Sequence, residues 1–95
     1  MKSIHDPRYV ALINRLRDVR KERNLTQQEL IAKLDKPMSY LAKIENFERR
    51  LDLVELYDLL QAMDMKLDVF LKDVEWIDWP VLLIYLLSWP AFLFI

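Results

Sequence analysis

No glycine occurs in this chain of 95 residues. Glycine supplies the left-handed backbone conformations that many tight turns require, so a chain without it is restricted to structures with few such turns. The apolar residues follow helical spacing in several short runs, and no segment shows the alternation of a half-buried strand. The sequence therefore predicts an all-α fold.

The composition is that of a single globular domain, with 54% hydrophobic and 31% charged residues. Because cysteine is absent, the chain holds no disulfide and no thiolate metal site, which is typical of cytoplasmic proteins. The first residues, MKSIHDPRY, lack the apolar run of a signal peptide. We expect a cytoplasmic protein.

Capping signals mark the first helix. It should begin at Asp6-Pro7, because the aspartate caps free backbone N–H groups and proline fits the first helical position. Asn24 should end it, since asparagine tolerates the left-handed conformation best after glycine.

A second and a third helix follow closely. Thr26 and Glu29 form a capping box, and "DKP" breaks the second helix before Pro37 opens the third, residues 37–46. The three-residue break should let the two helices cross closely, with the small Ala32 at the crossing. The inward positions are Leu30, Ile31, Leu34, Leu41 and Ile44.

Two more helices complete the predicted domain, residues 1–75. Asp52 and Glu55 form a second capping box, and Asp68 is expected to cap a fifth helix that reaches about Glu75. The buried side of the fourth helix should comprise Leu53, Leu56, Leu60 and Met63, and the fifth helix carries Val69, Phe70, Leu71 and Val74.

The pair of helices around the short break has the arrangement of a helix-turn-helix, in which the second helix is presented outward. Its outward positions would be Met38, Ser39, Ala42, Lys43 and Asn46. Similar turns occur in plain helical bundles, so the spacing alone leaves DNA binding and simple packing both open.

The charge distribution favours contact of the first half with a polyanion. Residues 1–50 hold 12 lysines and arginines against 7 acidic residues, whereas residues 51–95 hold 2 against 8. A basic half joined to an acidic half suggests that only the first faces the polyanion.

Residues 12–63 resemble the Cro/Xre-type helix-turn-helix family, to which the phage lambda repressor belongs. The family pattern is LTQEELA, a turn, and SYISKIE-GERR, and this chain reads LTQQELIAKL, KPMSYLAKIEN and FERRLDLVEL. It is also similar to a subgroup of small bacterial and phage-borne regulators with KPQS and ERRLD. The resemblance implies a five-helix lambda-repressor-like domain that binds a palindromic operator in double-stranded DNA as a homodimer, without a cofactor.

The resemblance also implies roles for individual residues. The side chains that would reach base edges are Met38, Ser39 and Lys43. Those that would contact the DNA backbone are Thr26, Gln27, Tyr40, Asn46, Arg49 and Arg50. Arg20 and Glu45 match an ion pair that ties the first helix to the third.

Two residues depart from the pattern. Met38 replaces a glutamine, which removes a bidentate partner for adenine. Phe47 replaces a glycine at the end of the third helix. Because phenylalanine resists a left-handed conformation, we expect either that Asn46 adopts it or that the helix extends.

Enzyme activity is not indicated. His5, the one histidine, has no partner at catalytic or metal-site spacing, and the sequence shows no nucleophile–base set or glycine-rich phosphate loop. We expect no catalytic residue and no metal site.

After Asp78 the sequence turns apolar: WPVLLIYLLSWPAFLFI, residues 79–95, contains no charge. We treat residues 76–95 as a tail for self-association or packing, for docking on another protein, or for a membrane. The uncharged stretch 81–95 would span only ~22 Å as a helix, less than the ~30 Å apolar core of a bilayer. The tail residues expected at an interface are Trp79, Leu82, Leu83, Leu86, Trp89 and Phe92.

Taken together, the residues and the resemblance predict a sequence-specific DNA-binding transcriptional regulator, a dimeric repressor that reads the major groove with residues 37–46. The alternative is an interaction protein, an antitoxin-like module or a membrane-tethered adaptor, whose tail 79–95 binds a protein partner or a membrane.

Overall fold

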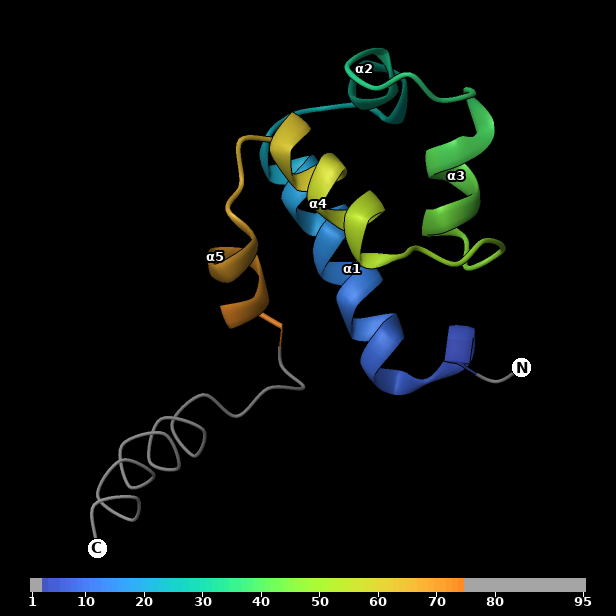
Figure 1. Cartoon of the computed structure of the whole chain (residues 1–95), viewed down its shortest axis with the longest axis vertical. Coiled ribbons are helices and arrows are strands. Elements are labelled where there is room, and N and C mark those ends of the chain that lie inside the picture. Colours follow the sequence, from blue (N-terminus) through green and yellow to red (C-terminus); the bar gives the residue numbers. More distant parts are fainter. Residues whose placement is uncertain (1–2, 75–95) are drawn as a thin grey trace, which may run out of the picture.

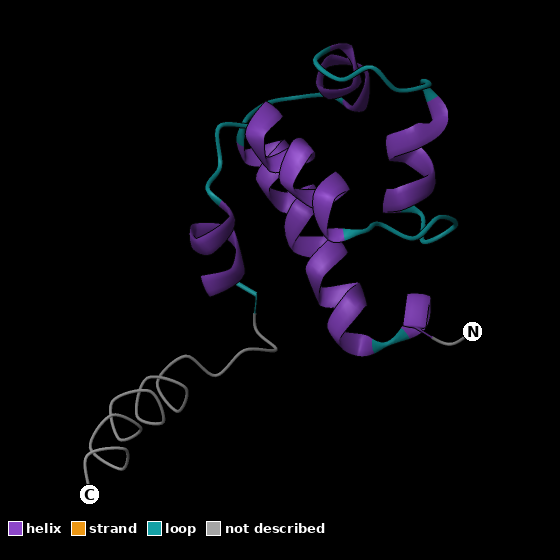
Figure 2. Ribbon diagram, in the orientation of Figure 1, coloured by secondary structure: helices purple, strands orange, loops and turns teal. Residues whose placement is uncertain are grey.

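The computed structural model describes residues 3–74 and confirms the all-α prediction for this part of the chain (Figures 1 and 2). A short 3-10 turn, Ser3–His5, precedes five α-helices. They are α1 (Pro7–Glu22), α2 (Gln27–Ala32), α3 (Ser39–Glu45), α4 (Leu53–Ala62) and α5 (Leu67–Lys72). The tail residues Trp79, Leu82, Leu83, Leu86, Trp89 and Phe92 lie outside the described residues.

The helices are arranged around α1, the longest of them. Helix α3 contacts both α1 and α2, and in Figure 1 α5 lies on the other side of α1 from α3. The loop between α3 and α4 is attached to α1, because the backbone N–H of Leu51 donates to the Tyr9 hydroxyl at 3.0 Å. The end of α1 is attached to the end of α4, where Arg23 Nε donates to the Met63 carbonyl at 2.7 Å.

One apolar cluster fills the space between the helices. Its buried members come from every α-helix: Ile13, Leu16, Val19, Leu30, Ile31, Tyr40, Leu41, Ile44, Leu51, Leu56, Leu59, Leu60, Met63, Phe70 and Val74. Burying a large aliphatic or aromatic side chain contributes roughly 1.5–3 kcal/mol, so this cluster is the main source of stability. Residues 3–74 therefore contain a buried apolar core to which all five α-helices contribute.

The helix starts confirm most of the capping predictions. Asp6 caps α1, accepting a hydrogen bond from the backbone N–H of Arg8 at 2.8 Å. Both capping boxes are present, at the starts of α2 and α4. The prediction for α5 was wrong, because this helix begins after Lys66 without a side-chain cap and ends at Lys72. Asp68 lies within its first turn instead.

Three further details of the prediction were wrong. Helix α3 begins at Ser39, because Pro37 forms a preceding turn in which its carbonyl accepts from the Tyr40 N–H. Ala32 is exposed, whereas Leu30 and Ile31 before it are buried in the core. Leu53 is 66% exposed, since the loop residue Leu51 is buried in the core at this end of α4.

Helices end in this chain without glycine at three positions. Asn24, Phe47 and Asp64 have φ values of 56°, 60° and 56°. Each of them directly follows the C-cap residue of a helix. At Phe47 the backbone N–H donates to the Ile44 carbonyl, and the next N–H, of Glu48, donates to the Lys43 carbonyl. This is a Schellman ending.

The expectation for the end of α3 was wrong, because Phe47 itself takes the left-handed conformation and Asn46 does not. A left-handed residue with a Cβ atom costs roughly 1–2 kcal/mol. The two hydrogen bonds of the Schellman ending and the packing of the half-buried Phe47 ring against the core offset that cost.

Candidate nucleic-acid interface

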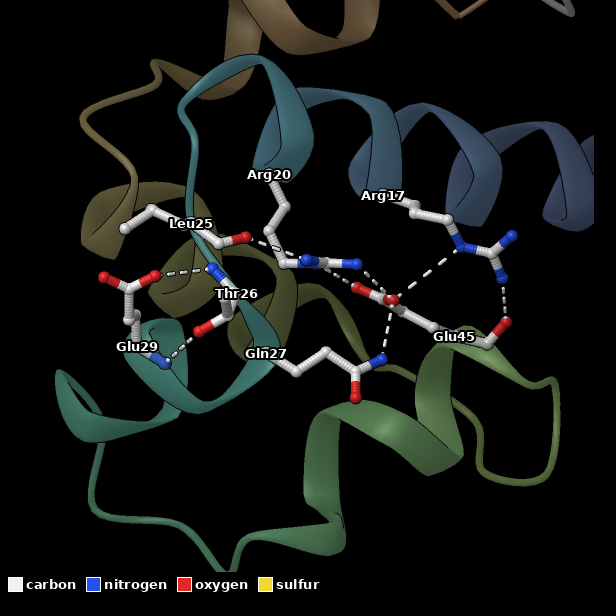
Figure 3. A network of polar contacts seen from close by, with 7 residues as sticks. All are labelled: Arg17, Arg20, Leu25, Thr26, Gln27, Glu29 and Glu45. Carbon is white, nitrogen blue, oxygen red and sulfur yellow. Dashed lines mark hydrogen bonds and ion pairs between the residues drawn. The ribbon is translucent and has the colours of Figure 1, made fainter.

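The start of α2 is fixed by a reciprocal pair of hydrogen bonds (Figure 3). The Glu29 N–H donates to the Thr26 hydroxyl at 3.0 Å, and the Thr26 N–H donates to Glu29 Oε1 at 2.9 Å. The hydrogen bond from the Thr26 backbone lowers the pKa of Glu29, which keeps the carboxylate ionised. The capping box therefore fixes the first turn of α2 locally, with the Thr26 side chain at the surface.

Glu45, near the end of α3, joins three helices through one carboxylate (Figure 3). Arg20 of α1 donates from Nε to Oε2 at 2.7 Å and from Nη2 to Oε1 at 2.9 Å. Gln27 of α2 donates from Nε2 to Oε1 at 2.9 Å. Arg17 lies farther away, with its Nε 3.7 Å from Oε1, and donates from Nη2 to the Glu45 backbone carbonyl.

This network is largely shielded from water. Glu45 is 2% exposed and Arg20 is 8% exposed, and the remaining Nη1 of Arg20 donates to the Leu25 carbonyl at 2.8 Å. Buried ion pairs fix geometry more reliably than they add stability. The network therefore sets the orientation of α3 relative to α1 and α2. The sequence indicated Arg20 and Glu45 as a pair, but it gave no signal for Gln27 or Arg17 at the same carboxylate.

The outer face of α3 carries the side chains expected to reach bases. Ser39 and Lys43 are exposed, and Met38, at the helix N-cap, is 59% exposed. They share this face because Leu41 and Ile44, on the opposite side of the helix, are buried in the core. A hydroxyl, an ammonium group and a thioether are therefore exposed together on one side of this helix. Helix α3 itself lies at the edge of the fold (Figure 1).

The side chains expected to contact the DNA backbone differ in exposure. Thr26, Asn46 and Arg50 are exposed, whereas Gln27 and Arg49 are half-buried. Tyr40 is only 6% exposed, so most of its ring faces the protein. Thr26 and Gln27 lie at the start of α2, and the other backbone candidates lie in α3 or in the loop after it.

A second polar cluster ties that loop to α4. Arg49 donates to both carboxylate oxygens of Glu55, at 3.2 and 2.8 Å. The bidentate contact with Arg49 lowers the pKa of Glu55 to about 2. Burial, together with the charge of Glu55, raises the pKa of Tyr40 to about 12. Sequence reasoning identified Glu55 as a capping residue only, because its contacts with Arg49 and Tyr40 are tertiary.

Other classes of site find no support in the described part of the chain. Among residues 3–74, no group of three or more histidine, cysteine, aspartate or glutamate side chains could hold a metal ion. None of the helices within that range is both long and apolar enough to span a membrane.

Comparison with known proteins places this geometry in a family. Residues 16–70 match the family described as Helix-turn-helix. The chain is 32% identical over 63 residues to Control protein C.MunI of Mycoplasma sp., a match that covers 65% of this chain and 85% of the relative. A solved structure, an XRE-family like protein from Pseudomonas syringae pv. tomato str. DC3000, superposes with a TM-score of 0.71 at 39% identity. That superposition covers 78% of this chain and 90% of the other.

The matched residues 16–70 include the capping box of α2, the Glu45 network and the exposed face of α3. The family is one of DNA-binding regulators and not of enzymes. The chain belongs to the Cro/Xre-type helix-turn-helix family of DNA-binding transcriptional regulators.

Proposed function

We propose that this protein is a cytoplasmic repressor that binds a palindromic operator in double-stranded DNA as a homodimer. The observation that carries the proposal is the Glu45 network, which joins α3 to α1 and α2 with both carboxylate oxygens engaged. A helix held in this way presents its outer side chains in a fixed orientation, as reading base edges in the major groove requires.

The exposed side chains of α3 and of its N-cap residue fit contacts with base edges. The Lys43 ammonium group is a donor suited to guanine O6 and N7, and the Ser39 hydroxyl suits several bases. Met38 offers an apolar surface to the methyl group of thymine. We therefore assign these three residues to base recognition.

Backbone contacts would come from both ends of the helix pair. At the start of α2, the Thr26 side chain is exposed, and Gln27 keeps one amide hydrogen for a phosphate because its Nε2 donates only once to Glu45. After α3, contacts with the DNA backbone would come from the exposed Asn46 and Arg50 and from the half-buried Arg49. The nearly buried Tyr40 lies beside Arg49 on this side of the site. Such contacts fix position on the duplex without reading sequence.

Dimerisation would come from the apolar tail. Residues 79–95 carry no charge, and an apolar segment of this length needs a partner surface. We assign the self-association interface to Trp79, Leu82, Leu83, Leu86, Trp89 and Phe92. Two copies would then present two α3 helices to half-sites about one helical turn, ~34 Å, apart.

The proposal is tested by selecting bound duplexes from a random pool with the purified full chain. The selected site should be an inverted repeat, and its affinity should fall steeply with salt, because phosphate contacts release counterions. Enrichment of no common site, or binding that is insensitive to salt, would overturn the proposal.

The second candidate function is docking of the tail on another protein or on a membrane, and the uncharged sequence of residues 79–95 favours it. An antitoxin-like module would co-purify with a partner in fixed ratio, and a membrane-tethered adaptor would sediment with phospholipid vesicles. Detergent-free full-length protein that is dimeric and remains in the supernatant with vesicles would exclude both.

A further inference from the structure

A basic cavity lies beside the exposed face of α3. It measures about 270 Å³ and is lined by Lys36, Pro37, Ser39, Tyr40, Lys43 and Arg49. Three of these residues are cations, two carry a hydroxyl group (Ser39 and Tyr40), and none carries a carboxylate. The residues come from the turn before α3, from α3 itself and from the loop after it, so the cavity borders the proposed base-reading face.

The nearly buried ring of Tyr40 holds two of the cations in place. The Lys36 ammonium nitrogen lies 5.2 Å from the ring centroid, and the central guanidinium carbon of Arg49 lies 4.7 Å from it. Cation–π contacts of this kind contribute ~0.5–1 kcal/mol each at exposed sites. The ring therefore contacts two of the cations that line the cavity in the absence of a ligand.

Only part of this positive charge is neutralised within the protein. Arg49 directs its guanidinium group at the Glu55 carboxylate, at 2.8 and 3.2 Å, and also donates to the Arg50 carbonyl. Within residues 3–74, the side chains of Lys36 and Lys43 form no ion pair. Lys43 is already assigned to the bases, which leaves Lys36 as a cation for another anionic group.

We propose that this cavity binds one phosphate group of the DNA backbone, with Lys36 as its cation and Tyr40 as the positioning residue. This inference rests on the proposed DNA-binding function and deepens it. Lys36 is a compact point charge on a flexible stem, which suits a phosphate oxygen. Tyr40 would act on the DNA backbone through Lys36 and Arg49.

The first test compares Lys36→Ala with Lys33→Ala, because Lys33 is exposed on α2 and its ammonium group donates to the Ala62 carbonyl, away from the cavity. Lys36→Ala should weaken binding to the selected operator and to a scrambled duplex by the same factor. It should also reduce the slope of log affinity against log salt by about 0.9, the value for one lost phosphate contact. Lys33→Ala should leave the slope unchanged.

A second test neutralises single phosphates. One by one, phosphates of the operator are replaced by uncharged methylphosphonates, and each duplex is titrated with wild type and Lys36→Ala. At one phosphate position in each half-site, wild type and Lys36→Ala should bind the methylphosphonate duplex with equal affinity. A loss that persists on every such duplex, or an unchanged salt slope, would overturn the phosphate site.

The role of Tyr40 is tested with variants that keep or remove the ring. Tyr40→Phe keeps the ring and should keep the wild-type salt slope, whereas Tyr40→Leu should show part of the reduction seen for Lys36→Ala. Circular dichroism checks that each variant is folded. If wild type binds no duplex, the proposed function fails; if it binds and the Lys36 variant matches it, only the phosphate site fails.

Discussion

The guanidinium group of Arg20 and the carboxylate of Glu45 form a two-point contact, at 2.7 and 2.9 Å, between the first and third helices. Both side chains are nearly buried, and 25 residues separate them in the sequence. Because Gln27 donates to the same carboxylate, the contact determines how the whole helix-turn-helix is held.

Removing one partner of this pair should be more damaging than removing both. Arg20→Met or Glu45→Leu alone leaves a buried charge without its partner, which costs roughly 3–5 kcal/mol of unfolding free energy. The double variant should lose much less. Urea denaturation of the four proteins gives the coupling energy, with Glu48→Gln as a control at an exposed neighbouring position. A coupling energy near zero would contradict the account of the pair.

Phe47 allows its backbone conformation to be separated from its packing. Both Phe47→Ala and Phe47→Gly remove the half-buried ring, but only glycine relaxes the backbone at φ 60°. We expect both variants to be less stable than wild type, with the alanine variant lower than the glycine variant by about 1 kcal/mol. Equal unfolding free energies, measured in urea, would show that the left-handed conformation costs nothing here.

The sequence predicted those parts of the fold that depend on local chemistry. Asp6 followed by proline, and Thr26 with Glu29, mark helix starts because side chain and backbone are only a few residues apart. The left-handed Asn24 was predictable for the same reason. Local signals of this kind also predicted a break between α2 and α3, but the break spans residues 33–38 and not the three residues expected.

Details that depend on packing between distant segments were not predictable. Leu53 has apolar spacing with Leu56, but it lies in the first turn of α4, where the preceding loop already fills the core. Phe47 was expected to avoid the left-handed region, and the core contact that offsets the cost was not visible. In the candidate site, family resemblance supplied the residues of α3, whereas the contacts of Lys36 with Tyr40 and of Glu55 with Arg49 were recognised only in the structure. These partners are four and six residues apart, but no capping or spacing rule pairs them.

Acid should weaken the attachment of the loop after α3 to α4. The folded-state pKa of Glu55, about 2, lies below its ordinary value of 4.5. Its contribution is therefore complete above pH 4.5 and is lost as the pH falls towards 2. Wild type should lose more stability than Glu55→Gln over this range. Arg8 also lowers the pKa of Asp6 to about 2. Because Asp6 is present in both proteins, its titration does not affect the difference between their stabilities. Parallel stability curves from pH 5 to pH 2 would contradict the assignment.

Deletion after Asp78 should leave the helix-turn-helix folded, because residues 3–74 hold a buried apolar core drawn from all five α-helices. If the tail forms the dimer, the shortened protein should be monomeric, and its operator affinity should fall steeply because the two half-sites are no longer bound by a linked pair. Sedimentation without detergent compares the two forms. A shortened protein that still dimerises and binds fully would remove the tail from the dimer interface.

The most direct test of the central claim is the affinity of wild type and Lys43→Ala for the selected operator at fixed salt, with Lys21→Ala as a control on the exposed surface of α1. Loss of one good base contact costs about 1–3 kcal/mol, or about 5- to 150-fold in affinity. The account predicts that Lys43→Ala loses this much on the operator and less on a scrambled duplex, while Lys21→Ala loses less than Lys43→Ala on the operator. Equal affinity of wild type and Lys43→Ala for the operator would contradict it.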